Sequence, residues 1–284
     1  MRTLNRSDDA QAPSYTVPPV ERAVRLLQAI SDGETVANLK RTALALGINR
    51  TTLMRLIRTL EAARFIEPIP NGNGYRIGLG LVGVAARASY SQDLMQSATP
   101  IVTHLAETVG LSSHLAVLDG TDALFLLRQV PNVPLASNIQ PGSRIPAYAT
   151  TLGRIILAYW PEERVTELFR EVKFRPFSEH TPRSLKSFHA VLAADRAAGY
   201  AWSDGHYTSG VCSAGFAVFD RSGKPVASIN VTGPQLMFKE TARRRERVIE
   251  ALRSAAHELS SRLGYVAANA AGATNGQGIS RKSA

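Results

Sequence analysis

Cysteine is nearly absent from this chain: Cys212 is the single cysteine among 284 residues. One cysteine cannot form a disulfide within the chain, and it cannot supply a metal site built on several thiolates. A cysteine nucleophile needs a nearby base and an electropositive setting, whereas a lone cysteine in an apolar strand is usually inert core. The cysteine content therefore fits a reducing compartment and argues against thiol chemistry.

Long apolar runs are missing as well. No segment approaches the roughly 20 consecutive apolar residues that a membrane-spanning helix needs. The polar start, MRTLNRSDDAQ, also lacks the apolar stretch of a signal peptide. We therefore expect a cytoplasmic protein with no membrane partner.

Recognisable catalytic and metal-binding arrangements are absent too. No two histidines stand four residues apart, the spacing that places two zinc ligands on one helical face. Gly78, Gly80 and Gly83 follow no buried strand and precede no Lys-Ser/Thr pair, so they do not indicate a phosphate-binding loop. We expect no catalytic residue, no metal and no cofactor. The alternative is a small-molecule-converting enzyme with an accessory nucleic-acid-binding head.

Acidic residues are outnumbered. There are 33 Lys and Arg against 23 Asp and Glu, which gives a formal net charge of +10. Such an excess favours polyanionic partners without identifying one. The segment from Lys40 to Arg76 alone holds seven basic and two acidic residues, so a surface for a polyanion is expected there.

Two helices and a turn are predicted within this basic segment. Apolar residues at three- and four-residue steps from Leu39 predict a helix that stops at Gly47, which can adopt the positive φ of a helix C-terminus. Asn49 or Thr51 can cap the next helix. The apolar stripe of that helix is Leu53, Leu56, Ile57 and Leu60, and its other face carries Arg50, Thr51, Thr52, Arg55 and Arg58.

A β-hairpin is predicted after the second helix. The period changes to two between Phe65 and Ile69, the turn residues Asn71-Gly72-Asn73-Gly74 follow, and Tyr75 to Ile77 continue. This order is typical of a winged helix-turn-helix, whose second helix enters the major groove of double-stranded DNA while the wing lies along the backbone. An ordinary solvated helix face is the alternative, but the turn and the wing favour DNA binding. The predicted DNA-binding residues are Asn49, Arg50, Thr51, Thr52, Arg55, Arg58, Asn73 and Arg76.

The expected organisation has two domains, a connector and two tails. It comprises a disordered tail over 1–16, a winged helix-turn-helix domain over 17–78, a linker helix over 79–91, an effector-binding domain over 92–265 and a disordered tail over 266–284. The linker is apolar, so it must pack against something. A partner subunit on Leu81, Val84, Ala85 and Ala88 would make a homodimer, and cover by the second domain of the same chain is the alternative.

Helical and extended patterns alternate in the second domain. Helices are predicted at Leu94–Val109, Thr151–Tyr159, Pro161–Val172, Leu185–Ala198 and Lys239–Leu263. Strands are predicted at His114–Leu118, Ala123–Val130, Tyr200–Ser203, Val211–Phe219 and Val226–Val231. Turns at Asp119–Asp122 and Asp220–Lys224 each join two strands. The pattern indicates an α+β domain with a largely antiparallel sheet.

Blocks of sequence in both domains follow a known order and spacing. They are Val20-Glu21-Arg22-Ala23, Gly47 to Ile57, Tyr75-Arg76-Ile77-Gly78, His114 to Gly120, Arg144-Ile145-Pro146 and Ala149 to Ala158. Together they resemble the IclR family of bacterial transcriptional regulators over about residues 17–263. The resemblance implies a homodimer or a dimer of dimers, and a second domain with a GAF-like fold that binds a small metabolite and shifts the DNA-binding heads. Family members commonly control catabolic operons.

The resemblance also implies where the metabolite binds. Carried over residue by residue, the effector pocket falls on Thr151, Leu152, Ser203, Asp204, Ser213, Asn230 and Thr232. A helix start at Thr151 would present free N–H groups that suit a carboxylate, so we expect a small organic acid. The alternative is that Thr150 or Thr151 only caps its helix and that Asn230 and Thr232 are ordinary strand positions.

The chain departs from the family pattern near this pocket. Tyr148 stands where a histidine is frequent, Arg154 where lysine is usual, and Ser213 where many members have cysteine. Tyr148, Trp202 and Tyr207 could form a wall for an aromatic acid, but packing at a sheet end is the favoured role. The sequence thus predicts a DNA-binding transcriptional regulator that senses a small carboxylate, with aromatic acids among the candidates.

Overall fold

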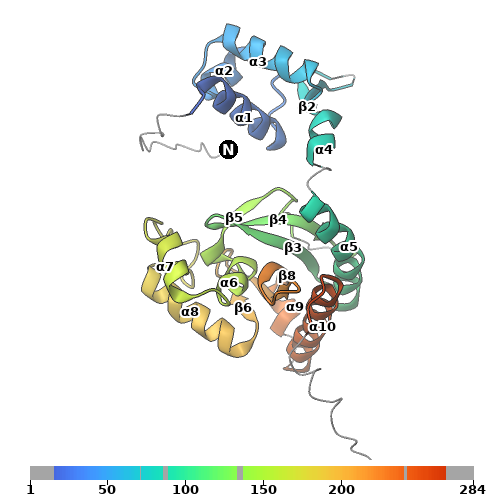
Figure 1. Cartoon of the computed structure of the whole chain (residues 1–284), viewed down its shortest axis with the longest axis vertical. Coiled ribbons are helices and arrows are strands. Elements are labelled where there is room, and N and C mark those ends of the chain that lie inside the picture. Colours follow the sequence, from blue (N-terminus) through green and yellow to red (C-terminus); the bar gives the residue numbers. More distant parts are fainter. Residues whose placement is uncertain (1–15, 71, 86–88, 133–136, 240–241, 267–284) are drawn as a thin grey trace, which may run out of the picture. The chain divides into compact units, whose positions relative to one another are not determined.

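The computed structural model describes residues 16–70, 72–85, 89–132, 137–239 and 242–266. The chain divides into two compact units, Met1–Gln92 and Asp93–Ala284 (Figure 1). The boundary expected from the sequence, between residues 91 and 92, lies one residue earlier. The predicted tails over 1–16 and 266–284 lie outside the described residues, except for Thr16 and Val266.

The described part of the first unit begins with three helices and a hairpin. They are α1 (Pro18–Ser31), α2 (Leu39–Ala45), α3 (Arg50–Ala62), β1 (Ile66–Pro68) and β2 (Tyr75–Ile77), and the two strands pair antiparallel. Leu26, Leu53, Ile57 and Ile66 are among the side chains of its buried core. Each helix thus buries one apolar side, which produces the winged helix-turn-helix that the sequence predicts.

Capping residues fix the turn between α2 and α3. Asn49 Oδ1 accepts a hydrogen bond from the backbone N–H of Thr52 at 2.7 Å, so Asn49 rather than Thr51 is the N-cap of α3. Gly47 has a φ of 64°, in the left-handed region that residues with a β-carbon rarely adopt. The start of α3 is therefore set by local chemistry.

Two helices follow the wing. α4 (Leu79–Ala85) occupies the start of the predicted linker, and residues 86–88 lie outside the described ones. α5 (Ser89–Val109) begins five residues before the predicted Leu94, so the end of the predicted linker belongs to α5. Its early start has a simple cause: residues 89–93 are polar, and the apolar period that predicts a helix begins only at Leu94.

The second unit contains a six-stranded sheet. Its strands are β3 (Ser112–Asp119), β4 (Asp122–Gln129), β5 (Arg144–Pro146), β6 (Ala201–Asp204), β7 (Val211–Phe219) and β8 (Pro225–Pro234). All neighbours pair antiparallel, in the order β5-β4-β3-β8-β7-β6. The hairpins β3–β4 and β7–β8 are those predicted from their turns. The three-residue strand β5 was not predicted.

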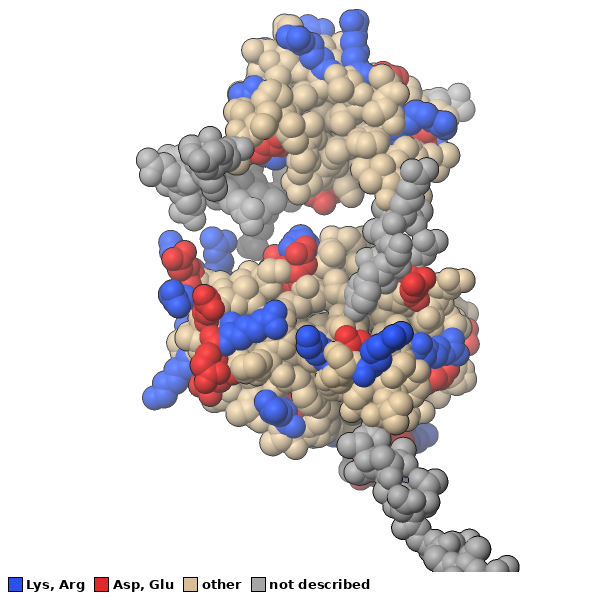
Figure 2. All heavy atoms as spheres, in the orientation of Figure 1, with Lys and Arg blue, Asp and Glu red and all other residues tan. Residues whose placement is uncertain are grey.

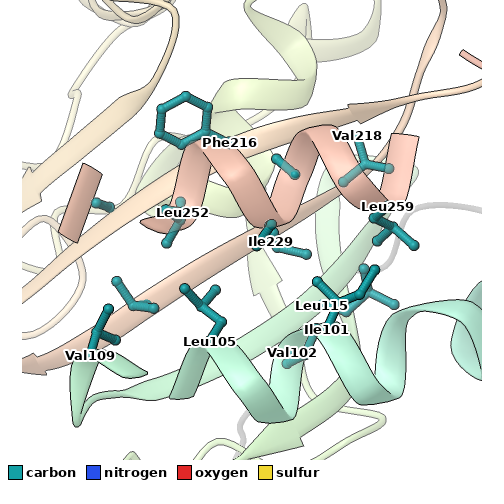
Figure 3. Packing of buried hydrophobic residues seen from close by; sticks show 14 of the residues in the cluster. Ile101, Val102, Leu105, Val109, Leu115, Phe216, Val218, Ile229, Leu252 and Leu259 are labelled. Atoms are coloured by element: carbon teal, nitrogen blue, oxygen red, sulfur yellow. The ribbon is translucent and has the colours of Figure 1, made fainter. Parts of the chain in front are cut away.

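Helices cover both faces of this sheet (Figure 1). On one face, α5 and α10 (Ala242–Arg262) enclose an apolar core with Leu115 of β3 and Ile229 of β8 (Figure 3). The other face carries the short helix η1 (Ala147–Ala149), α6 (Thr151–Leu157), α7 (Glu162–Phe169) and α8 (Leu185–Ala198). α9 (Gln235–Lys239) precedes α10, where the sequence predicted one helix over Lys239–Leu263. The result is an α+β domain with a GAF-like fold.

Candidate functional sites: a DNA-reading helix and a cavity on the sheet

The polar face of α3 is a cationic surface. Arg50, Arg55 and Arg58 are exposed, as are Asn49 and Thr51, while Thr52 is half-buried. On the opposite side of the helix, Leu53, Ile57 and Leu60 are buried in the core. Basic side chains gather along the part of the first unit that α2 and α3 form (Figure 2). The helix therefore presents its guanidinium groups to solvent and holds the domain together with its apolar stripe.

The arginines of α3 differ from the arginine of the wing in their ion pairing. Among the described residues, Arg50, Arg55 and Arg58 enter no ion pair. Arg76 lies opposite Glu67 in the β1–β2 register, and its Nη2 is 2.8 Å from Glu67 Oε1. Asn73, at the wing tip, is exposed. The charge of the wing is thus partly neutralised within the protein, whereas that of α3 is available to an anion.

A cavity of about 320 Å³ lies on the sheet face that carries α6. Its lining residues come from all six strands of the sheet, from the end of η1, from the start of α6 and from the loops that flank them. They are His114, Phe125, Ser137, Asn138, Ile139, Ile145, Ala149, Thr150, Thr151, Ser203, Tyr207, Thr208, Val211, Ser213, Asn230, Thr232, Gly233 and Pro234. No lining residue is an acid, a lysine or an arginine, so among the described residues the wall is neutral apart from its histidine.

Strand alternation explains why polar groups line this cavity. In β8, Ile229 and Val231 point into the core with α5 and α10, so Asn230 and Thr232 point to the opposite face. In the antiparallel pairing of β3 with β8, His114 lies opposite Asn230. The polar members of the alternation therefore gather on one face of the sheet.

A chain of hydrogen bonds links these residues to α6. His114 Nδ1 lies 3.0 Å from Asn230 Oδ1, and Asn230 Nδ2 donates to Thr151 Oγ1 at 3.4 Å. Thr151 Oγ1 is in turn 3.1 Å from Ser213 Oγ. Gly215 of β7 permits the close approach, because a β-carbon there would lie 3.2 Å from Thr151 Cβ. The network holds the cavity's polar atoms in fixed positions.

His114 is neutral in this setting. Burial lowers the pKa of His114 from 6.5 to about 4, although the hydrogen bond with Asn230 opposes the shift. The side chain is 0% exposed, and its ring meets Phe125 edge-on with the centroids 5.5 Å apart. Its second nitrogen, Nε2, is buried and has no hydrogen-bond partner among the residues that the structure describes. Within the described residues, Nδ1 of the imidazole therefore has a hydrogen-bond partner and Nε2 has none.

Two of the seven predicted effector residues do not line the cavity. Leu152 is fully buried in an apolar cluster with Ala116 and Phe125, because the second residue of α6 points its side chain into the sheet. Asp204 accepts a hydrogen bond from Cys212 Sγ at 3.0 Å. The predicted residues that do line the cavity are Thr151, Ser203, Ser213, Asn230 and Thr232.

The start of α6 differs in part from the expectation that Thr151 opens the helix and that free N–H groups there face a carboxylate. The N-cap of α6 is Thr150, whose Oγ1 accepts from the backbone N–H of Gly153 at 3.0 Å. Thr151 therefore has a free hydroxyl for the network above, and both threonines line the cavity. The alternative reading of the sequence, in which one threonine caps the helix, holds for Thr150.

The three aromatic candidates take different positions. Tyr148 is 2% exposed and packs against Phe174 with the ring centroids 4.8 Å apart, so it is a packing residue, as favoured. Trp202 packs against the core on the α5 and α10 side of the sheet. Tyr207 lines the cavity.

Sequence reasoning missed several lining residues. His114, Phe125, Ile139 and Ile145 line the cavity but were not named as site residues. Phe125 and Ile145 look like ordinary core positions, and nothing local marks them. A signal for His114 exists: a histidine inside an otherwise apolar strand needs a polar partner.

Two further findings concern the other classes of site. Within the described ranges, no three His, Cys, Asp or Glu side chains are grouped so that they could hold a metal ion. Likewise, no described helix combines the length and apolarity needed to cross a membrane.

Comparison with known proteins gives matches along nearly the whole described chain. The family profile described as bacterial transcriptional regulator IclR C-terminal matches residues 86–261, and the IclR helix-turn-helix domain matches residues 19–70. The HTH-type transcriptional regulator XynR of Escherichia coli is 26% identical over 253 residues, covering 88% of this chain and 99% of XynR.

Solved structures agree with this assignment. An IclR transcriptional regulator from Alicyclobacillus acidocaldarius superposes with a TM-score of 0.75 at 25% identity, covering 88% of this chain and 100% of the other. An IclR homologue from Microbacterium hydrocarbonoxydans, complexed with 4-hydroxybenzoate, gives a TM-score of 0.76 at 22% identity, covering 86% and 98%. The winged helix, the GAF-like sensor domain and these matches together show that the chain belongs to the IclR family of DNA-binding transcriptional regulators, whose members control catabolic genes.

Proposed function

We propose that α3 reads the operator through Arg50, Thr51, Thr52, Arg55 and Arg58, and that Asn73 and Arg76 of the wing contact the adjacent backbone. The observation that carries this proposal is the contrast on α3 between solvent-facing guanidiniums without ion pairs and a buried apolar stripe. Guanidinium and hydroxyl groups are suited to base edges and phosphates in the major groove. Asn49 has a smaller role in this proposal, since its side chain oxygen already caps α3.

Operator binding tests this proposal. The wild-type protein should bind duplex DNA from its own upstream region far more tightly than unrelated duplex, with an affinity that falls steeply with salt. Arg55→Ala should weaken that binding by about 1–3 kcal/mol if Arg55 contacts a base. Arg170→Ala is a matched control, because Arg170 is an exposed arginine at the end of α7. Equal affinity of both variants for the operator would rule out this role of Arg55.

We also propose that the cavity on the sheet binds a small organic acid. Its volume is at the lower end of the range of small-molecule pockets, about 300–1,000 Å³, which suits a molecule with one ring. Phe125, Ile139, Ile145 and Tyr207 offer surface for a ring, and the hydroxyls of Ser203 and Ser213 offer donors to a carboxylate. The Microbacterium relative holds 4-hydroxybenzoate, which makes this acid the first probe.

Thermal unfolding tests the cavity. An acid that binds only the folded protein stabilises it by about 2.7 kcal/mol at 100 times its Kd, so Tm should rise. Ser213→Val removes a hydroxyl and fills part of the cavity, and should abolish most of the rise. An undiminished rise in Ser213→Val would place the acid elsewhere.

We further propose that the protein is a homodimer, or a dimer of dimers, that pairs through α4. Leu79, Val82 and Val84 are exposed on this short helix, and Leu81 is half-buried. The side chains of Ala85 and Ala88, also predicted to face a partner, lie outside the described residues. Several exposed apolar side chains on one short helix are typical of a protein–protein contact.

A further inference from the structure

One polar atom in the cavity wall is left without a partner by the protein. Among the described residues, none pairs with the buried Nε2 of His114, although His114 stands at the end of a network whose other polar atoms are paired. A buried polar atom left unpaired destabilises a folded protein, so it calls for an explanation. A ligand that pairs with it on entering the cavity supplies one.

The network determines what Nε2 can do. Asn230 turns its Nδ2 towards Thr151, so its Oδ1 faces His114 and accepts a hydrogen bond from Nδ1–H. A neutral imidazole carries one proton, and burial keeps this ring neutral by lowering the pKa of His114 to about 4. Nε2 is then a bare acceptor. A carboxylate, which only accepts, cannot pair with it.

On the basis of the effector function proposed above, we propose that the ligand of this cavity carries a hydroxyl, or another hydrogen-bond donor, that donates to Nε2 of His114. His114 is then the residue that selects a hydroxy acid over the same acid without the hydroxyl. The edge-on contact with Phe125 holds the imidazole plane, and the bond to Asn230 sets its tautomer, so the acceptor is fixed before the ligand arrives.

The selection follows from the cost of an unmade bond. A site built to hydrogen-bond a hydroxyl rejects the analogue without it, because the buried polar atom then stays unpaired after water has been excluded. No described residue donates to Nε2, so the protein offers it no substitute for the ligand's hydroxyl. The ligand's carboxylate is left to the hydroxyls that line the cavity.

Three acids of similar shape test this assignment on the full-length protein: 4-hydroxybenzoate, 4-methoxybenzoate and benzoate. Only the first has a donor at the para position. Calorimetric titration of the wild type should give a Kd at least tenfold lower for 4-hydroxybenzoate than for either analogue. In His114→Phe, which keeps an aromatic ring and removes the acceptor, the three Kd values should converge to within about twofold. Ile139→Val is the control, since it alters the same lining without a polar atom and should keep the preference.

The outcomes separate this inference from the proposed function. Equal binding of all three acids by the wild type, or an unchanged preference in His114→Phe, would overturn the role of His114 while leaving an acid effector in place. A third outcome is that none of the three acids binds, although the wild-type protein is folded and binds its operator. That outcome would exclude benzoic acids as effectors, and with them the proposed role of His114. Should His114→Phe fail to fold, the wild-type series still decides, and ¹⁵N NMR of the wild-type imidazole must show Nε2 unprotonated.

Discussion

At the scale of single residues, the buried His114 makes the stability of the protein depend on pH. Burial, and to a lesser degree the positive charge of Arg128, disfavour the charged form of the ring. An unfolded chain has no such restriction, so its histidine takes up a proton near pH 6.5. The folded protein is therefore sensitive to mild acid through a side chain that lies in its sensor cavity.

The stability of the sensor domain should fall as pH falls from about 6.5 towards 4. The pKa of His114 is lowered to about 4 in the folded state, so over this window the unfolded state binds the proton and the folded state does not. The loss amounts to about 3 kcal/mol across the window, since one pKa unit corresponds to about 1.4 kcal/mol. Urea unfolding at pH 7 and pH 5 should show about 2 kcal/mol of this loss in the wild type and none of it in His114→Phe. A wild type that loses no more stability than the variant would contradict the assignment.

Site residues were predictable to different extents. The arginines of α3 follow from sequence because helical periodicity separates them from Leu53, Ile57 and Leu60. Ser213 and Asn230 came from the resemblance, and the strand alternation explains their place. Phe125 and Ile145 were not predictable, because an apolar side chain that lines a cavity has the same local pattern as one in the core. The pairing of Arg76 with Glu67 required the hairpin register.

At the scale of elements, the position of α6 depends on a buried ion pair. Arg154 of α6 donates from Nε and Nη2 to the carboxylate of Asp195 on α8, both at 2.8 Å, and Nη2 also donates to the carbonyl of Trp202 on β6. Arg154 is 1% exposed and Asp195 is 6% exposed. These bonds join two helices and a strand behind the cavity, so they hold the helix that presents Thr151.

Asp195→Ala should destabilise the sensor domain by about 3–5 kcal/mol, because it leaves the buried charge of Arg154 without its partner. Asp119→Ala is the matched control: it removes the partner of Arg144 in an exposed ion pair, which should cost less than about 1 kcal/mol. Denaturant unfolding of both variants gives the comparison. Similar losses in the two would show that the buried pair does not hold α6.

The elements themselves were largely predictable. β7 runs over Val211–Phe219 as predicted, since its apolar run is bounded by clear turn residues. β8 extends past the predicted Val231 to Pro234, where Gly233 weakens the strand signal. The edge strand β5 is too short for any period to show. Its place is set by pairing with β4, a long-range contact that local sequence does not encode.

At the scale of the whole molecule, the proposed pairing through α4 joins at least two copies of a 30.7 kDa chain. Sedimentation equilibrium of the wild type should give twice that mass for a dimer, or four times that mass for a dimer of dimers. Val84→Asp places a charge on the exposed apolar side of α4 and should shift the equilibrium towards the monomer. Leu236→Asp, at a site 86% exposed on α9, should leave it unchanged. A monomeric wild type, or an effect of Leu236→Asp equal to that of Val84→Asp, would argue against pairing through α4.

Regulation requires that the acid and the operator bind with linked free energies. A ligand shifts an equilibrium only as far as it distinguishes the two states, and the effect is reciprocal. The shift can go towards tighter or weaker operator binding, but it must be measurable if the two sites are linked.

The most direct test is the operator Kd measured with and without the acid that raises Tm. The operator Kd of the wild type should change at least about fivefold when the acid is added. Ser213→Val should keep the operator affinity of the free protein and lose the response, because its change is confined to the cavity. An operator Kd that stays the same when the acid is shown to occupy the cavity would contradict the central claim that this cavity controls DNA binding.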